Sequence, residues 1–407
     1  MKTQYLIMAA YMVCPIPTLH AASLERSDQS ISAFLEPNNY AELDLAIIDT
    51  NIKGDVQFKE IISELGVQNF STGNLAQREF SGKFALKLQP HSKISTGLIY
   101  EQPYQTDISY QYSPALPDGS TINIEAADIN FESHSLTGLI GFQPNTQWNF
   151  YSGLSLQSFK GNLEITGQQY QALNGYHAKF KNDDALGWLI GLSYQLPQYA
   201  LKTSLTYRSK IKHKNQTSES TLYSNGPFIL TPDTDTRIET PQSVNFEFQT
   251  GISARNLVYG SVRWVNWQDF IIQPPQLEVV LDYAARDPQY RELAHLNLID
   301  YKKDQWSGKF GFAHQLNPTL ITGLEYIWDQ GSGNPASTLN PSDGYQGIGL
   351  GGMYNLNPST FIASGMYYLK FKKPQIEATS HTTQISGLSS VADNDAWVYG
   401  VKIGHRF

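Results

Sequence analysis

The chain has 407 residues, with 29 Lys and Arg against 37 Asp and Glu, and charged residues make up only 16 % of it. Soluble domains usually carry about 25 % charged residues, whereas aromatic residues reach 12 % here and the mean hydropathy is −0.35. The acidic balance argues against a nucleic-acid-binding protein, and no apolar run after residue 20 approaches the ~20 residues of a membrane-spanning helix.

Residues 1–21 have the composition of a secretory signal peptide. Lys2 supplies the positive start, an apolar stretch follows at 6–13, and cleavage is expected after Ala21 or Ala22. The alternative is a short buried helix. Cys14, the only cysteine of the chain, lies in this segment, so the exported protein is expected to contain no disulfide.

From residue 40 onward, apolar and polar residues alternate with a period of two. In 243–253, for example, Val244, Phe246 and Phe248 alternate with polar residues. Because successive side chains of a strand point to opposite faces, each such segment has one apolar and one polar surface. Residues 22–39 are too polar and irregular for a strand, and no amphipathic helix is expected after residue 36.

The connections between these segments fall into two classes. Short polar turns are expected at 89–91, 143–146, 195–198, 254–256, 315–318 and 355–358. Long irregular loops, among them 165–184, 215–241, 271–305 and 374–394, alternate with these turns. Transmembrane barrels have short periplasmic turns and long external loops.

The alternation predicts an all-β fold, a fourteen-stranded antiparallel transmembrane β-barrel in the bacterial outer membrane. The expected strands are 40–56, 79–89, 92–104, 120–142, 147–164, 185–196, 199–214, 242–253, 257–270, 305–315, 319–330, 345–355, 359–373 and 395–407.

The last of these strands has a sharply divided pattern. Trp397, Tyr399, Val401 and Ile403 share one face, and the chain stops at Phe407. A terminal aromatic residue resembles the signal that the barrel assembly machinery of the outer membrane recognises. The seven tryptophans are expected in the aromatic girdles at the membrane interfaces: Trp148, Trp188, Trp264, Trp267, Trp306, Trp328 and Trp397.

Several segments of the chain form recognisable motifs: Leu205–Ile211 (LTYRSKI), Thr240–Ser243 with the following Arg263–Phe270 (RWVNWQDF), Gly331–Pro335 and the closing 399–407. These segments resemble the FadL/TodX family of outer-membrane transporters of hydrophobic compounds. The start of the mature chain, around Leu24–Ser27 and Asn39–Glu42, is similar to the shorter members. The order of these segments, more than any single one, carries the resemblance.

The resemblance implies a barrel over residues 40–407 that is plugged by a short N-terminal hatch at 22–39. It also implies passive uptake of long-chain fatty acids or hydrocarbons, which leave sideways through a gap at the third strand. The Asn-Pro-Ala motif that larger members carry in the hatch does not occur after the signal. The chain alone does not select between fatty acids and hydrocarbons.

Candidate ligand-binding residues lie in the two loops after strands five and seven and in the hatch. The loops carry exposed-looking apolar residues, and such patches often bind ligands, although the loops can also pack on themselves. The hatch residues either touch the ligand or form a plug. The set comprises Phe34, Leu35, Tyr176, Phe180, Tyr223, Phe228 and Leu230.

The third strand is the expected site of lateral release. Pro103 cannot donate to a sheet ladder, so it belongs at a bulge, an opening or a strand end. Gly97 is grouped with it as a gate residue, and Tyr100 and Tyr104 beside it as ligand-binding residues.

Arg208 is the expected partner of a ligand carboxylate, because it matches the Tyr-Arg-Ser motif of the family and its alternation faces the lumen. The alternative is a lumen salt bridge to Glu247 or Glu325. The row formed by Lys210, Lys212 and Lys214 is expected to continue inward.

No catalytic residue, metal site or cofactor is predicted, because the histidines lack ligand spacing and no G-x-S-x-G motif occurs. The expected partners are a hydrophobic small molecule, outer-membrane lipid and lipopolysaccharide, and the assembly machinery at Phe407. Nucleic acid is not expected, and the protein is expected to be a monomer. The alternative function is a diffusion porin for small polar solutes.

Overall fold

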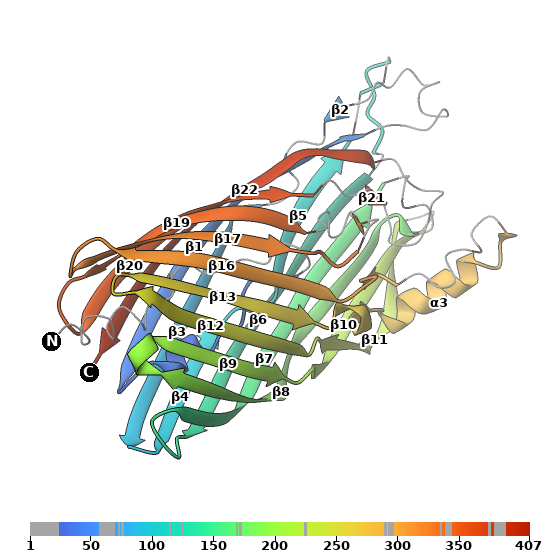
Figure 1. Ribbon diagram of the computed structural model, residues 1–407. Helices are drawn as coiled ribbons and strands as arrows, with labels where there is room; N and C mark the ends of the chain where they lie inside the picture. The colour runs from blue at the N-terminus through green and yellow to red at the C-terminus, as the bar shows by residue number, and fades with distance from the viewer. Residues whose placement is uncertain are drawn as a thin grey trace.

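The computed structural model describes residues 24–56, 70–71, 74, 77–113, 115–116, 118–123, 125–167, 170, 173–223, 226–288, 291, 297–333, 336–337, 344–372, 376–377 and 388–407. Within these ranges the chain forms a closed antiparallel β-barrel of fourteen strands (Figure 1). No helix in the described part of the chain is both long and apolar enough to cross a membrane.

Eleven of the fourteen barrel strands are single elements, and three consist of two collinear parts. In chain order they are β1 (Tyr40–Val56), β3 (Glu79–His91), β4 (Ile94–Glu101) with β5 (Gln105–Tyr112), β6 (Glu125–Phe142), β7 (Trp148–Thr166), β8 (Tyr176–Leu196), β9 (Leu201–Arg208) with β10 (Ile211–Tyr223), β11 (Gly226–Thr240) with β12 (Ser243–Ser253), β13 (Asn256–Val265), β16 (Gln305–Gln315), β17 (Leu320–Asp329), β19 (Tyr345–Asn355), β20 (Thr360–Phe371) and β22 (Leu388–Arg406).

The first and last strands close the barrel. β1 pairs with β22 from Tyr40 opposite Arg406 to Val56 opposite Leu388. Two-residue strands lie outside this ladder or at its edge: β2 (Phe70–Ser71), β14 (Ile271–Ile272), β15 (Ile299–Asp300), β18 (Ala336–Ser337) and β21 (Ile376–Glu377). The short helices are η1 (Ser32–Leu35), η3 (Pro197–Tyr199), η4 (Trp267–Asp269) and α3 (Pro275–Ala284).

The alternation of the sequence separates the outer wall from the lumen, as expected. In β22, Trp397 and Ile403 are 40 % and 46 % exposed on the outer wall, whereas Val398 between them is 1 % exposed. The tryptophans lie on this outer wall, and one of them is an exception to the prediction. Trp267, expected in a girdle, is fully buried in η4 at the inner side of the barrel.

Two expected long loops are largely strand. Residues 165–184 and 215–241 contribute to β7, β8, β10 and β11, and β10 pairs with β11 from Ile211 opposite Thr240 onward. Their Pro, Asn, Ser, Asp and Gly content favours loops at the level of sequence. A hairpin that rises beyond the lipid has water outside, so polar residues can occupy its outer face.

The helix α3 was not expected. It buries Leu277 and Leu281, four residues apart on one helical face, with Ala284 packed beside them, while Val279 and Tyr283 are exposed. Two buried positions in ten residues, next to Pro274 and Pro275, give too weak a helical period to recognise.

The prediction that Lys210, Lys212 and Lys214 face the lumen is wrong. Lys210, Lys212 and Lys214 lie on the outer wall, 45–69 % exposed, and pair with Glu239 and Asp235. β9 ends at Arg208 and β10 begins at Ile211, and the two residues between them shift the alternation by one. A shift of one residue moves every following side chain to the other face.

We call the end with the six short turns the periplasmic end and the opposite end the external end, as in other transmembrane barrels. The C-terminus lies at the periplasmic end, and α3 projects at the external end beside β10 and β11 (Figure 1). Phe407 is 55 % exposed, and its amide donates to the carbonyl of Asn39.

Candidate functional site

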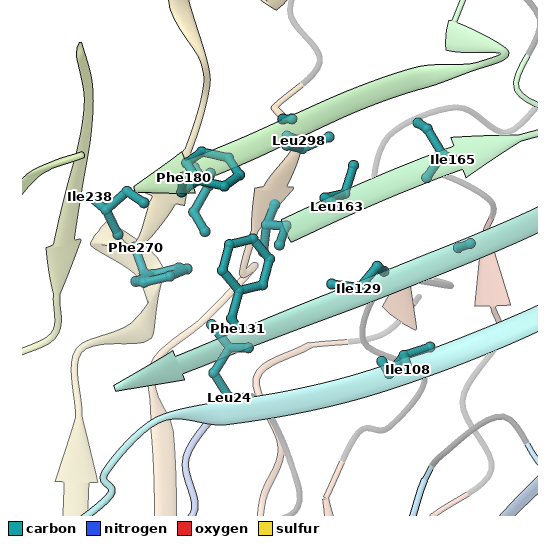
Figure 2. Packing of buried hydrophobic residues seen from close by; sticks show 14 of the residues in the cluster. Leu24, Ile108, Ile129, Phe131, Leu163, Ile165, Phe180, Ile238, Phe270 and Leu298 are labelled. Atoms are coloured by element: carbon teal, nitrogen blue, oxygen red, sulfur yellow. The ribbon is translucent and has the colours of Figure 1, made fainter. Parts of the chain in front are cut away.

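A cluster of buried apolar side chains fills the external half of the lumen, and we call it the external cluster. Figure 2 shows its members converging from β5, β6, β7, β8 and β11. Every member is 7 % exposed or less, so the cluster is closed to solvent. Among those labelled are Leu24, Ile108, Ile129, Phe131, Leu163, Ile165, Phe180, Ile238, Phe270 and Leu298.

Four aromatic side chains form one corner of this cluster. Trp267 packs against Tyr104, Phe270 and Tyr301 with ring centroids 4.8–5.8 Å apart. Edge-to-face aromatic packing of this kind offers polarised ring faces and edges to a flat apolar ligand. Sequence reasoning missed Trp267, Phe270 and Tyr301, although the first two lie in the RWVNWQDF segment just after the last alternating residue of β13.

The helix α3 covers the cluster at the external end, and a carboxylate from β10 holds its first turn. Glu219 accepts hydrogen bonds from the amides of Leu277 (2.8 Å) and Gln276 (3.3 Å) and from the hydroxyl of Tyr176 (2.8 Å). Acceptors at a helix N-terminus stabilise it by meeting its free amides. Burial raises the pKa of the Glu219 carboxyl and of the Tyr176 phenol, both of which lie beyond the lipid-facing part of their strands.

The third strand of the barrel is interrupted between β4 and β5. β3 pairs with β4 only up to Phe84 opposite Tyr100, and the pairings of β5 in the described chain are all with β6. Residues 79–83 of β3 therefore have a strand partner, β1, on one side alone. Pro103 lies in this interruption, which we call the break.

The N-terminal segment, residues 24–39, meets the break from inside. The amide of Arg26 donates to the carbonyl of Pro103, and the amide of Gln105 donates to the carbonyl of Leu24, both at 2.8 Å. Glu25 and Tyr104 thus form an antiparallel bridge. The guanidinium of Arg26 also pairs with Glu79 of β3, so the segment touches both sides of the break.

Further ion pairs bind the same segment to the lumen wall. Glu25 pairs with Arg263, and Asp28 pairs with Lys309 at 3.1 Å. Arg208 donates to the carbonyl of Gln29 at 2.9 Å and lies 3.8 Å from the carboxylate of Glu101.

Of the two expectations for Arg208, the structure describes the salt bridge, but with a different acid. Glu101 of β4 is the acid beside Arg208 in place of the expected Glu247 or Glu325, and Arg208 also bonds to the N-terminal segment at Gln29. Glu247 instead accepts from Ser30 and Ser204, and Glu325 from Tyr367.

Phe34 is buried inside the barrel near the periplasmic end, against the wall. Its ring lies over two glycines, so that a Cβ on Gly97 would sit 2.5 Å from its Cδ2 and one on Gly141 would sit 3.0 Å from its Cζ. Tyr151 packs edge-on against the same ring at 6.0 Å. Below it, Leu35 and the short turns line a vestibule of about 440 Å³. Gly97, expected at the gate, therefore makes room for Phe34.

Of the remaining predicted site residues, some lie in the lumen and one lies on the outer wall. The side chains of the others are not described by the structure. Tyr176 and Phe180 belong to the external cluster, and Leu230 is half-buried. Tyr100 lies on the outer wall below the break, where its hydroxyl is 2.8 Å from His134 Nδ1. The side chains of Tyr223 and Phe228, and the expected signal peptide, lie outside the described residues.

The family model that matches this chain and the solved structures that resemble it belong to the same group of outer-membrane proteins. A family model described as outer membrane protein transport protein (OMPP1/FadL/TodX) matches residues 23–407. No curated protein matches the chain by sequence.

Solved structures resemble the whole barrel at low identity. A FadL homologue of Pseudomonas aeruginosa is 13 % identical with a TM-score of 0.64, covering 92 % of each chain. The toluene transporter TodX of Pseudomonas putida is 13 % identical with a TM-score of 0.63, covering 97 % of this chain and 96 % of its own. The toluene transporter TbuX of Ralstonia pickettii is 11 % identical with a TM-score of 0.58, covering 98 % and 99 %.

Replacing Phe34 by Ala is expected to make the barrel leaky to small polar solutes, because it removes the ring that fills the space over Gly97 and Gly141. Swelling of proteoliposomes in small sugars measures the leak. Phe131→Ala is the matched control, since Phe131 also packs over a glycine, Gly161, but in the external cluster. Both changes cost about 3–5 kcal/mol of stability. Equal swelling of the two variants would contradict the role of Phe34.

Replacing Glu219 by Ala is expected to loosen α3 without unfolding the barrel. Loss of a helix cap costs about 1 kcal/mol, which corresponds to roughly fivefold faster amide exchange. Hydrogen–deuterium exchange of residues 275–284 measures this. Glu239→Ala, on the outer wall of the neighbouring strand and paired with Lys210, is the control. Unchanged exchange in α3 would show that Glu219 does not hold it.

Proposed function

The chain belongs to the OMPP1/FadL/TodX family of outer-membrane transport proteins, and from that premise we propose that it takes up uncharged hydrophobic small molecules by passive diffusion and releases them sideways at the break. It is a transport protein of the outer membrane and not an enzyme. In this proposal residues 24–39 form the hatch, the external cluster receives the ligand, and the break is the exit.

The observation that carries this proposal is the continuity between the external cluster and the break. Leu24 and Tyr104 belong to the cluster, and both are also part of the backbone bridge that occupies the break. A ligand that displaces apolar contacts around Tyr104 therefore acts directly on that bridge. The neighbours TodX and TbuX are described as toluene transporters, which supports a hydrophobic ligand for this fold.

The arrangement of the lumen disfavours the porin alternative. A porin needs a continuous aqueous lumen. Here the external cluster occupies the external half, ion pairs of the N-terminal segment cross the middle, and Phe34 is buried near the periplasmic end. Hydrophobic molecules can leave such a barrel through the wall, where the bilayer offers them a favourable solvent.

The charge balance beside the N-terminal segment favours an uncharged ligand over a fatty acid. At residues 24–29 of this segment, four cations each have a carboxylate partner: Arg26, Arg208, Arg263 and Lys309. Their partners are Glu79, Glu101, Glu25 and Asp28, and the carboxylates of Glu247 and Glu325 add two further acids. Farther along the segment, Lys83 and Lys87 donate to the carbonyls of Ser30 and Glu36. A buried carboxylate needs a cation and hydrogen-bond donors of its own, so a fatty-acid anion beside residues 24–29 would have to displace one of these acids.

Locking the break is expected to abolish uptake. Gly82 of β3 and Gln102 face each other there, since the Gly82 amide donates to the Gln102 side chain at 3.2 Å. Gly82→Cys with Gln102→Cys, made with Cys14→Ser and joined by a short reducible cross-linker, should reduce uptake of a labelled hydrocarbon by cells to background. Reduction should restore it.

The control places the same cross-link where the ladder is continuous. Leu86 and Leu98 are direct partners on β3 and β4, so joining cysteines at these two positions should leave uptake unchanged. Full uptake through the locked break would disprove lateral release, and an equal loss in the control would assign the effect to the cross-linker.

The preference for uncharged ligands is tested with a long-chain alcohol and the fatty acid of the same chain length. At neutral pH the alcohol is expected to bind at least about tenfold more tightly, a difference of about 1.4 kcal/mol. Glu101→Gln removes the acid partner of Arg208 and should strengthen binding of the acid while leaving the alcohol unchanged. Tighter binding of the fatty acid to the unmodified protein would overturn the preference.

A further inference from the structure

The indole of Trp267 carries a buried hydrogen-bond donor without a partner. Trp267 is 0 % exposed and belongs to the external cluster, and its Nε1 has no hydrogen-bond partner within the described part of the chain. Burying an N–H group in this way is unfavourable, because the group loses its hydrogen bond to water. Few buried polar groups in native proteins lack a partner, so this one calls for a physical reason.

Comparable donors close by do have partners. The phenol of Tyr176 in the same cluster donates to Glu219 at 2.8 Å. Trp264, three positions before Trp267 in the RWVNWQDF segment, donates from its Nε1 to the carboxylate of Asp304 at 3.1 Å. The open donor at Trp267 is therefore a particular feature of the external cluster and not a general property of its aromatic residues.

Hydrogen bonds on both sides hold Trp267 in place. Before it, the amide of Asn266 donates to the carbonyl of Gln242 at 3.1 Å, and the Asn266 side chain donates to Asp304 at 2.9 Å. After it, the amide of Phe270 donates to the carbonyl of Trp267 at 3.0 Å. The indole is thus positioned before a ligand arrives, which lowers the entropy that binding has to overcome.

The donor lies beside the proposed way out of the barrel. Tyr104, whose ring centroid is 5.8 Å from that of Trp267, also forms the bridge to Glu25 that occupies the break. A ligand that displaces contacts around Tyr104 therefore meets the Trp267 indole. An indole nitrogen donates and does not accept, so it recognises an acceptor such as the oxygen of a ketone, an ester or an ether.

We propose that the preferred ligands carry an uncharged oxygen acceptor on an apolar body, and that the Trp267 N–H donates a hydrogen bond to this oxygen. The inference rests on the proposed function, because it names the class of compound that the external cluster receives. A pure hydrocarbon can pack against the same rings, but it leaves the donor unpaired. A site with a buried polar group discriminates against a ligand that leaves this group without a partner.

Acetophenone and α-methylstyrene test the donor, since they have nearly the same shape and differ in a carbonyl oxygen against a methylene group. Trp267 is replaced by benzothienylalanine, which keeps the shape of the indole and has sulfur in place of N–H. Binding of each labelled compound is measured on the whole barrel in nanodiscs and corrected for partition into empty nanodiscs. The replacement is expected to weaken acetophenone binding about fivefold, the effect of one neutral hydrogen bond, and to leave α-methylstyrene binding unchanged. It should not lower the thermal stability of the unliganded barrel.

The matched control is the same replacement at Trp264, whose N–H is paired with Asp304. There it should lower the stability and leave the ratio of the two binding constants unchanged. Equal effects of the Trp267 replacement on both compounds would overturn the inference. A loss of stability of the unliganded barrel would overturn it too, because the N–H would then already have a partner such as a bound water. If neither compound binds to the unmodified protein, the external cluster is not the ligand site and the proposed function itself is contradicted.

Discussion

The need to pair every backbone amide and carbonyl inside a bilayer governs this structure. Thirteen strand pairs and the closing pair of β1 with β22 meet that need around the barrel. Beside β3 the ladder stops at Phe84, and there the amide of Arg26 and the carbonyl of Leu24 bond to Pro103 and Gln105. The N-terminal segment thus completes the wall at the place where the strand does not, which couples the filling of the lumen to the integrity of the sheet.

The lumen is divided into zones by chemistry. The external half holds the external cluster, which α3 covers. The middle holds ion pairs between the N-terminal segment and the wall, and the periplasmic part opens as a vestibule below Phe34. Because the cations at residues 24–29 are matched with carboxylates, these ion pairs rigidify that part of the segment. The break lies at the boundary of the first two zones, where Tyr104 belongs to both.

Alternation and turn spacing were enough to predict the fourteen strands, the closed barrel and the apolar outer wall, since these depend on local periodicity. Features that depend on a change of register or on distant contacts were not predictable. The two residues between β9 and β10 shift the register, so that the lysines face outward. Arg208 lies beside Glu101 and bonds to Gln29, which is some 180 positions away in the chain. Trp267 was placed in a girdle because composition does not tell whether a residue just after a strand turns inward. The contact of Gly97 with the ring of Phe34 was not predictable either, because Phe34 lies in η1, some sixty residues earlier in the chain.

The backbone bridge between Leu24–Arg26 and Pro103–Gln105 has a consequence for how the barrel is assembled. The bridge lies inside a cylinder whose seam joins the first strand to the last. Residues 24–39 lead directly into β1, so the segment that forms the bridge and the strand that forms the seam are continuous. We therefore expect a change that breaks the bridge to affect the closing of the seam as well.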